Sequence, residues 1–121
     1  MNTGGILEVQ NNPEFSVIRI SGFIDAATVE RIKPVVTAEL SADCTNIVMD
    51  LEKVEFLDSH GIGFFVSLLK RVNARQGKLV FCSVCPQPVS VLNMVGFNNK
   101  LITYCDSFRQ AQALLGKNGA A

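Results

Sequence analysis

Short apolar runs that predict strands alternate with longer stretches that predict helices, and this alternation constrains the fold more than any other feature of the chain. Two strands come first, separated by the turn signal Asn11-Asn12-Pro13, which favours an antiparallel pair. Each later strand is separated from the next by a helix, which implies parallel pairing through right-handed crossovers. The sequence therefore predicts an α/β fold of order β-β-α-β-α-β-α-β-α, a mixed β-sheet of about five strands with about four helices packed against it.

The expected strands cover residues 6–10, 15–21, 47–51, 78–84 and 101–104. The expected helices cover residues 26–40, 61–75 and 89–95, with a last helix that ends at Leu115. Asp25 is placed to cap the first helix, and Asp106 or Ser107 the last. Pro34 lies inside the first helix and should kink it or divide it into two pieces. Pro88 can start the third helix.

Apolar side chains in residues 61–75 recur at spacings of three and four, which indicates an amphipathic helix. Phe64 and Leu68 widen its apolar face, so we expect this helix to be well buried. Gly77 favours a stop just beyond it.

Length and composition fit one folded domain. The chain has 121 residues, of which 48% are hydrophobic and 18% charged. We expect a single domain over residues 1–121, with a core at about 6–115 and a frayed tail at 116–121. The formal net charge is zero, from 11 basic and 11 acidic residues, so no basic field for nucleic acid is visible. A local basic run, Lys70, Arg71, Arg75 and Lys78, is interpreted as a solvated helix face.

No membrane or export signal is evident. The first residues lack the positive region and apolar core of a signal peptide, and no apolar stretch approaches the length that spans a bilayer. We therefore expect a cytoplasmic protein.

The cysteines are Cys44, Cys82, Cys85 and Cys105, which should be reduced thiols in a cytosolic protein. Cys82 and Cys85 have the spacing of a redox or zinc pair. In a strand, however, their side chains would point to opposite faces, and the chain has no second ligand pair and only one histidine. Small buried thiols are the favoured interpretation, and a redox or metal protein is an unlikely third class of function.

A strand runs into a short turn at Asp58-Ser59-His60-Gly61, where a helix starts. Ser59 is thereby placed at a helix N-terminus, where backbone N–H groups and the helix dipole favour negative charge. The local interpretation is an ordinary N-cap. A phosphate on Ser59 would lie in the same field and add close to two negative charges.

These residues resemble the phospho-acceptor motif of STAS domains, the family of bacterial anti-sigma factor antagonists, usually Asp-Ser-Ser/Thr-Gly. His60 stands where the family has its second hydroxyl. Three weaker matches fall in the order that the family has: Gly22-Phe23-Ile24-Asp25, Asp50-Leu51 and Val91-Leu92-Asn93-Met94-Val95-Gly96-Phe97. The resemblance covers about residues 6–115.

The resemblance implies a phosphorylation-controlled switch and no enzyme or cofactor. Unphosphorylated at Ser59, the chain would bind an anti-sigma factor with a histidine-kinase-like ATPase fold, itself the serine kinase, and so release the sigma factor. A metal-dependent serine phosphatase would reverse the modification. An independent enzyme is disfavoured because no acid/base pair, metal cluster or nucleophile–His spacing is present. The alternative is a STAS module of a non-sigma partner-switching pathway or a transport complex.

The candidate partner-binding residues surround this turn. The resemblance implies that Asp58 shapes the kinase-binding loop, where Ser59 and His60 follow it, and that the loop of Asp25 lies beside this one. Phe23, Ile24, Leu57 and Ile62 could form an apolar rim, which marks an interface only if it is exposed as one patch. Gly61 completes the set, although close packing at a helix start also explains a glycine there, as it does for Gly63.

Overall fold

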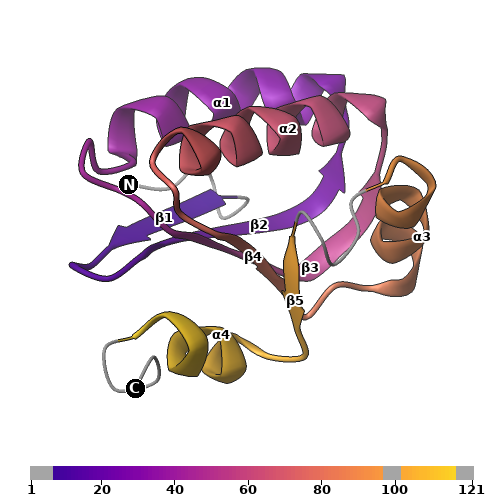
Figure 1. Ribbon diagram of the computed structural model, residues 1–121. Coiled ribbons are helices and arrows are strands. Elements are labelled where there is room, and N and C mark those ends of the chain that lie inside the picture. The colour runs from indigo at the N-terminus through magenta and orange to yellow at the C-terminus, as the bar shows by residue number, and fades with distance from the viewer. Residues whose placement is uncertain (1–6, 97–101, 117–121) are drawn as a thin grey trace.

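A five-stranded sheet, with its strands in the same order in space as in the sequence, organises the computed structural model, which describes residues 7–96 and 102–116 (Figure 1). The strands are β1 (Leu7–Asn11), β2 (Ser16–Ile24), β3 (Ile47–Leu57), β4 (Leu79–Cys82) and β5 (Thr103–Cys105). The helices are α1 (Ala26–Glu39), α2 (Ser59–Ala74), α3 (Pro86–Met94) and α4 (Phe108–Leu115). The predicted order is confirmed.

Among the strands of the described residues, only the first pair is antiparallel. β1 pairs antiparallel with β2, and each later neighbour is parallel to the one before it. Each parallel connection contains one helix, because a strand can return parallel to its predecessor only through a long crossover. The sheet is mixed, as predicted.

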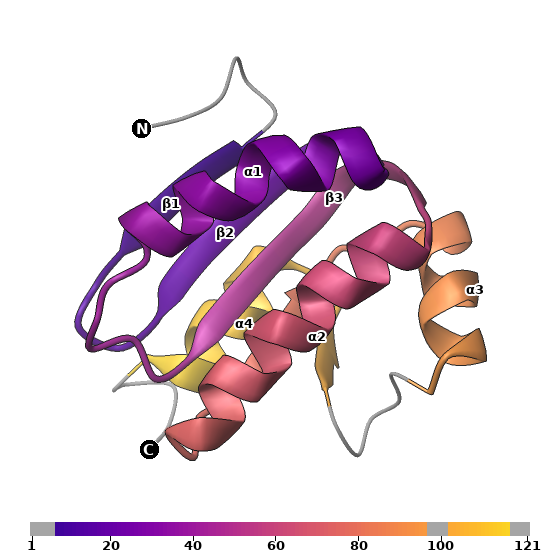
Figure 2. The ribbon, with the colours of Figure 1, turned by 90° about the horizontal axis from the view of Figure 1, so that it is seen from above.

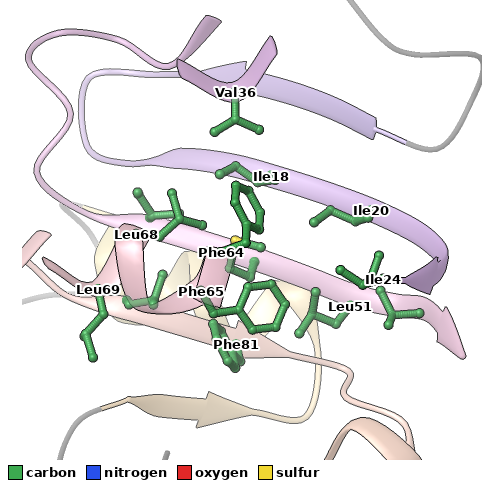
Figure 3. Close-up of a cluster of buried hydrophobic side chains, with 14 of the residues drawn as sticks. Ile18, Ile20, Ile24, Val36, Leu51, Phe64, Phe65, Leu68, Leu69 and Phe81 are labelled. Atoms are coloured by element: carbon green, nitrogen blue, oxygen red, sulfur yellow. The ribbon is translucent and has the colours of Figure 1, made fainter. Parts of the chain in front are cut away.

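The helices cover the two faces of the sheet unequally. α1 and α2 lie side by side over one face, α4 lies on the opposite face, and α3 sits beside the far end of β3 (Figures 1 and 2). The main core fills the space between the sheet and the helices α1 and α2, where Phe65 of α2 meets Phe81 of β4 with ring centroids 5.1 Å apart (Figure 3). A smaller apolar cluster, with Val17, Val48 and Ala111, lies against α4.

β3 continues six residues beyond the expected end at Leu51. Its pairing with β2 shifts register twice, between Arg19 and Ser21 and between Gly22 and Phe23. Each shift leaves one extra residue on β3, a β-bulge, so Leu51, Val54 and Leu57 face the core at spacings of three rather than two. Sequence alternation therefore could not reveal this half of the strand.

The predicted division of this helix at Pro34 is wrong, because α1 is one continuous helix. Pro34 is exposed, so the carbonyl that loses its helical partner can be hydrated. The expected strand at 78–84 is also too long: β4 ends at Cys82, and Ser83 has a positive φ of 60°. α3 begins at Pro86 rather than Val89.

Two predicted caps are confirmed. Asp25 caps α1 by accepting a hydrogen bond from the Thr28 N–H, and Ser107 caps α4 through the Gln110 N–H. The predicted strand residues Ile6 and Leu101, the motif residue Phe97 and the tail at 117–121 lie outside the described residues.

Candidate functional site

The ends of β2 and β3 bring two helix N-termini together. Ile24 and Leu57 are register partners, and the Asp58 N–H donates to the Ile24 carbonyl at 3.3 Å. Asp25, the residue that directly follows β2, caps α1, and Asp58 caps α2. The predicted neighbourhood of Asp25 and Asp58 thus follows from parallel strands that end together. We call Asp25, Asp58, Ser59 and His60 the Ser59 surface.

Asp58, not Ser59, is the N-cap of α2. Its Oδ1 accepts from the His60 N–H at 2.8 Å and from the Gly61 N–H at 3.3 Å. Ser59 is therefore the first residue of the helix, and the local interpretation of its hydroxyl as a cap is wrong. Ser59 is exposed, and its hydroxyl has no hydrogen-bond partner among the described residues.

Gly61 lets α2 approach the strand ends closely. A Cβ at this position would lie 2.2 Å from Leu57 Cδ1 and 3.0 Å from the Ile24 carbonyl oxygen. At Gly63, by contrast, a Cβ would meet nothing within 4 Å. Gly61 is buried, so it supports the turn through this close approach.

Gln87 of α3, which the sequence did not single out, supports the turn from the other side. Its Oε1 accepts from the Leu57 N–H at 2.9 Å, and its Nε2 donates to the Leu57 carbonyl at 3.3 Å. A glutamine two residues into a helix carries no sequence signal for this contact, because only the tertiary fold brings α3 to the end of β3.

The side chains of His60 and Asp25 differ in their hydrogen bonding. The His60 side chain is 60% exposed, with Nδ1 3.6 Å from Asp58 Oδ1. The Asp25 carboxylate accepts from the Thr28 N–H at 3.0 Å, and this hydrogen bond lowers the pKa of Asp25 below its usual value. Asp25 is therefore ionised at neutral pH, on a surface that also carries the Asp58 carboxylate.

The apolar rim differs from the expected one. Ile24 and Leu57 are 0% and 1% exposed, and Ile62 is partly buried against the main core. The Ile24 side chain is thus part of the core and not of an exposed apolar rim. Phe23 is 57% exposed and stacks at 5.5 Å between centroids on Phe56, 38% exposed, which the sequence did not single out. The bulges of β3 hid the outward direction of Phe56.

The four cysteines are free thiols in the described part of the chain. Cys82 is buried in β4, and burial raises the pKa of its thiol to about 12. Cys85 precedes α3, and its Sγ–H donates to the Glu52 carbonyl at 3.4 Å. Cys44 is buried, whereas Cys85 and Cys105 are only partly so. Among residues 7–96 and 102–116, no group of three His, Cys, Asp or Glu side chains could hold a metal ion.

No helix within residues 7–96 and 102–116 is both long enough and apolar enough to span a bilayer.

Two neighbouring strands each lead into a helix that begins with an aspartate cap, and an exposed serine follows the second cap. This is the arrangement expected of a STAS domain. The STAS domain profile matches residues 7–111, and the chain belongs to this family. The anti-sigma factor antagonists among its members are non-enzymatic regulatory proteins.

The similar proteins within this family include anti-sigma factor antagonists. The anti-sigma F factor antagonist of Paenibacillus polymyxa is 26% identical over 91 residues, 74% of this chain and 78% of that protein. A putative anti-sigma factor antagonist from Thermotoga maritima has the same fold, with a TM-score of 0.81 at 18% identity over 92% of this chain and 95% of that one. The structure of the Bacillus cell fate determinant SpoIIAA in its phosphorylated form matches with a TM-score of 0.69 at 22% identity, over 89% and 98% of the two chains.

Proposed function

We propose that this chain is a single-domain, phosphorylation-controlled anti-sigma factor antagonist. Unphosphorylated, it binds an anti-sigma factor with a histidine-kinase-like ATPase fold, which is also its serine kinase, and frees the sigma factor. A metal-dependent serine phosphatase restores the binding form. The observation that carries the proposal is the exposed Ser59 hydroxyl, which has no hydrogen-bond partner among the described residues and directly follows the Asp58 cap. A phosphorylated structure of SpoIIAA, a neighbour in fold, is consistent with it.

The position of Ser59 supports its use as an acceptor. A kinase can reach the hydroxyl without breaking an internal contact, because Asp58 already caps the helix. A phosphate there would lie at the positive end of the dipole of a 16-residue helix, which favours an anion. Modification therefore leaves the fold intact and changes only the surface.

The expected effect of the phosphate is on binding. Asp25, Asp58, Ser59 and His60 form the polar part of the partner contact, with Ile62 and Phe23 as apolar neighbours. The phosphate adds close to two negative charges beside two carboxylates. A charge left buried and unpaired at an interface costs several kcal/mol, which lowers affinity more than about a hundredfold.

His60 favours a second candidate with the same fold. Its exposed imidazole, 3.6 Å from the Asp58 carboxylate, replaces a hydroxyl beside the acceptor. A kinase that reads this turn must accommodate a larger, hydrogen-bonding ring. The chain would then serve a partner-switching pathway without a sigma factor, or a transport complex.

The test combines modification and binding. The purified chain is incubated with ATP and each histidine-kinase-like anti-sigma ATPase of its own organism, and intact mass is measured. We expect one added phosphate, its loss in Ser59→Ala, and its retention in Ser67→Ala. Ser67 is a matched control because it lies in the same helix with its hydroxyl bonded to the Phe64 carbonyl.

Binding is then measured for both forms by calorimetry. We expect the unmodified chain to bind the ATPase and the Ser59-phosphorylated chain to bind at least about a hundredfold more weakly. Undiminished phosphorylation of Ser59→Ala would refute the site. Recovery of a stable non-sigma partner, with no ATPase bound, would favour the second candidate.

A further inference from the structure

One construction is used twice at the end of the sheet. Phe23-Ile24-Asp25 and Phe56-Leu57-Asp58 each consist of an exposed ring, a buried aliphatic side chain and a carboxylate that caps a helix. The two segments are in parallel register, with Phe23 opposite Phe56 and Ile24 opposite Leu57. The same three-residue arrangement is therefore present twice, at the ends of two neighbouring strands.

We propose that Phe23 and Phe56, which we call the aromatic pair, are the apolar anchor for the partner protein that binds the Ser59 surface. The inference rests on the proposed function and deepens it. The partner is the anti-sigma ATPase, which presents an apolar socket of aliphatic or aromatic side chains to the two rings.

The aromatic pair lies on a two-stranded ribbon formed by the ends of β2 and β3. Among the described residues, β1 pairs with β2 as far as Ile20, and β4 pairs with β3 as far as Asp50. Beyond these points, residues 21–24 and 53–57 pair with each other. Ile24 and Leu57 fill the side of the ribbon that faces the main core, so the rings emerge from the other side.

No element of the described chain covers the rings. α4, on that face of the sheet, packs on Phe15, Val17, Val48 and Val80, near the opposite ends of the strands. The rings contact each other at 5.5 Å between centroids, inclined by 33°. Together they leave 57% of Phe23 and 38% of Phe56 exposed. Two adjacent, pre-ordered aromatic side chains that remain in water are typical of a binding anchor, because their burial needs little further ordering.

Ser59 and the aromatic pair are close enough for one partner protein to contact both. Phe56 is three residues before Ser59, at most roughly 10 Å away at about 3.3 Å per strand residue. A typical interface covers about 800 Å² on each partner, a patch of roughly 16 Å radius. An ATPase centred on Ser59 at the end of the ribbon therefore extends over the aromatic pair.

The shape of the site favours a protein over a small molecule. The nearby groove, of about 280 Å³, is lined by Arg19, Asp50 and Lys53 among others, and neither ring belongs to its lining. The exposed residues that precede Phe56 in β3 are charged: Glu52, Lys53 and Glu55. An apolar centre with a polar rim is the anatomy of a protein interface.

The experiment measures the affinity of the ATPase identified by Ser59 phosphorylation for Phe23→Ser, Phe56→Ser and the double variant. We expect each single variant to bind about 30-fold more weakly, because aromatic hot spots have effects of this size. Leu114→Ser is the matched control: Leu114 is 37% exposed, nearly the same as Phe56, but lies on α4. It should bind within about twofold of the wild type.

A second measurement needs no variant. Hydroxyl-radical footprinting of the wild-type complex, followed by mass spectrometry, should show protection of both Phe23 and Phe56 but not of Leu114. Wild-type affinity in the double variant, or unprotected rings in the complex, would overturn the inference while the proposed function stands. If no ATPase binds the wild type, the proposed function itself fails and the inference fails with it.

Discussion

The side-chain amide of Gln87 makes with Leu57 the two hydrogen bonds that a neighbouring strand would make. The distances are 2.9 Å from the Leu57 N–H and 3.3 Å to its carbonyl. β4 has already parted from β3 at Asp50, so the backbone at Leu57 would otherwise have no partner on this side. α3 thus fixes the residue that precedes the Asp58 cap.

Gln87→Ala should destabilise the fold by about 1–3 kcal/mol, because it leaves a buried N–H and a buried carbonyl unsatisfied. Urea denaturation measures the loss, and hydrogen exchange at Leu57 should accelerate. Ser90→Ala is the control, since Ser90 is an exposed residue of the same helix, and its effect should stay within about 0.5 kcal/mol. Equal effects of the two substitutions would contradict a specific role for the amide.

The two glycines at the start of α2 should respond in opposite directions. Gly61→Ala places a methyl group 2.2 Å from Leu57 Cδ1, and we expect a loss of about 1–3 kcal/mol from overpacking. Gly63→Ala adds its methyl to open space and should stabilise the protein by about 0.5–1 kcal/mol through helix propensity. Thermal and urea unfolding of both variants decide the matter, and a tolerated Gly61→Ala would refute the close approach.

Capping and modification can be separated at adjacent residues. Asp58→Ala removes the acceptor for the His60 and Gly61 N–H groups and should cost about 1 kcal/mol of stability. Ser59→Ala removes no hydrogen bond among the described residues and should change stability by less than about 0.5 kcal/mol. A comparable loss in both variants, measured by urea denaturation, would show that Ser59 shares the capping role.

The Asp25 cap should depend on pH in a predictable direction. The Thr28 N–H lowers the pKa of Asp25 below 3.8 in the folded state. Its stabilising effect is therefore complete above pH 3.8 and is lost as the pH falls through the lowered pKa. Asp25→Asn keeps a neutral cap, so the advantage of the wild type should shrink between neutral and strongly acidic pH. A pH-independent difference in urea denaturation would contradict this assignment.

The thiols should differ in reactivity. Burial, with a smaller contribution from the nearby Asp50 charge, raises the pKa of Cys82 from 9.0 to about 12. Ellman's reagent should therefore label the partly exposed Cys85 in the native protein and Cys82 only after unfolding. The stability associated with the protonated Cys82 is complete below pH 9.0 and is lost as the pH rises toward 12, so Cys82→Ala should flatten the alkaline decline. Rapid native labelling of Cys82 would refute its burial.

Local patterns in the sequence determined the order of elements. Apolar runs and turn signals gave the succession of strands and helices, and the long helix after the turn was evident from its periodicity. The Asp25 and Ser107 caps were also visible, because a capping side chain bonds to backbone within its own first turn. The family resemblance followed from the same short stretches.

Contacts between distant segments decided what lies on the surface. Two bulges against β2 carried β3 on to Leu57, buried Ile24 and Leu57, and turned Phe56 outward beside Phe23. The contact of Gln87 with Leu57 spans 30 residues of sequence. Strand register and helix docking depend on packing contacts across the whole sheet. A short stretch of sequence does not contain these contacts. The sequence by itself thus determined which residues surround Ser59 along the chain, and the tertiary structure decided which of them a partner can touch.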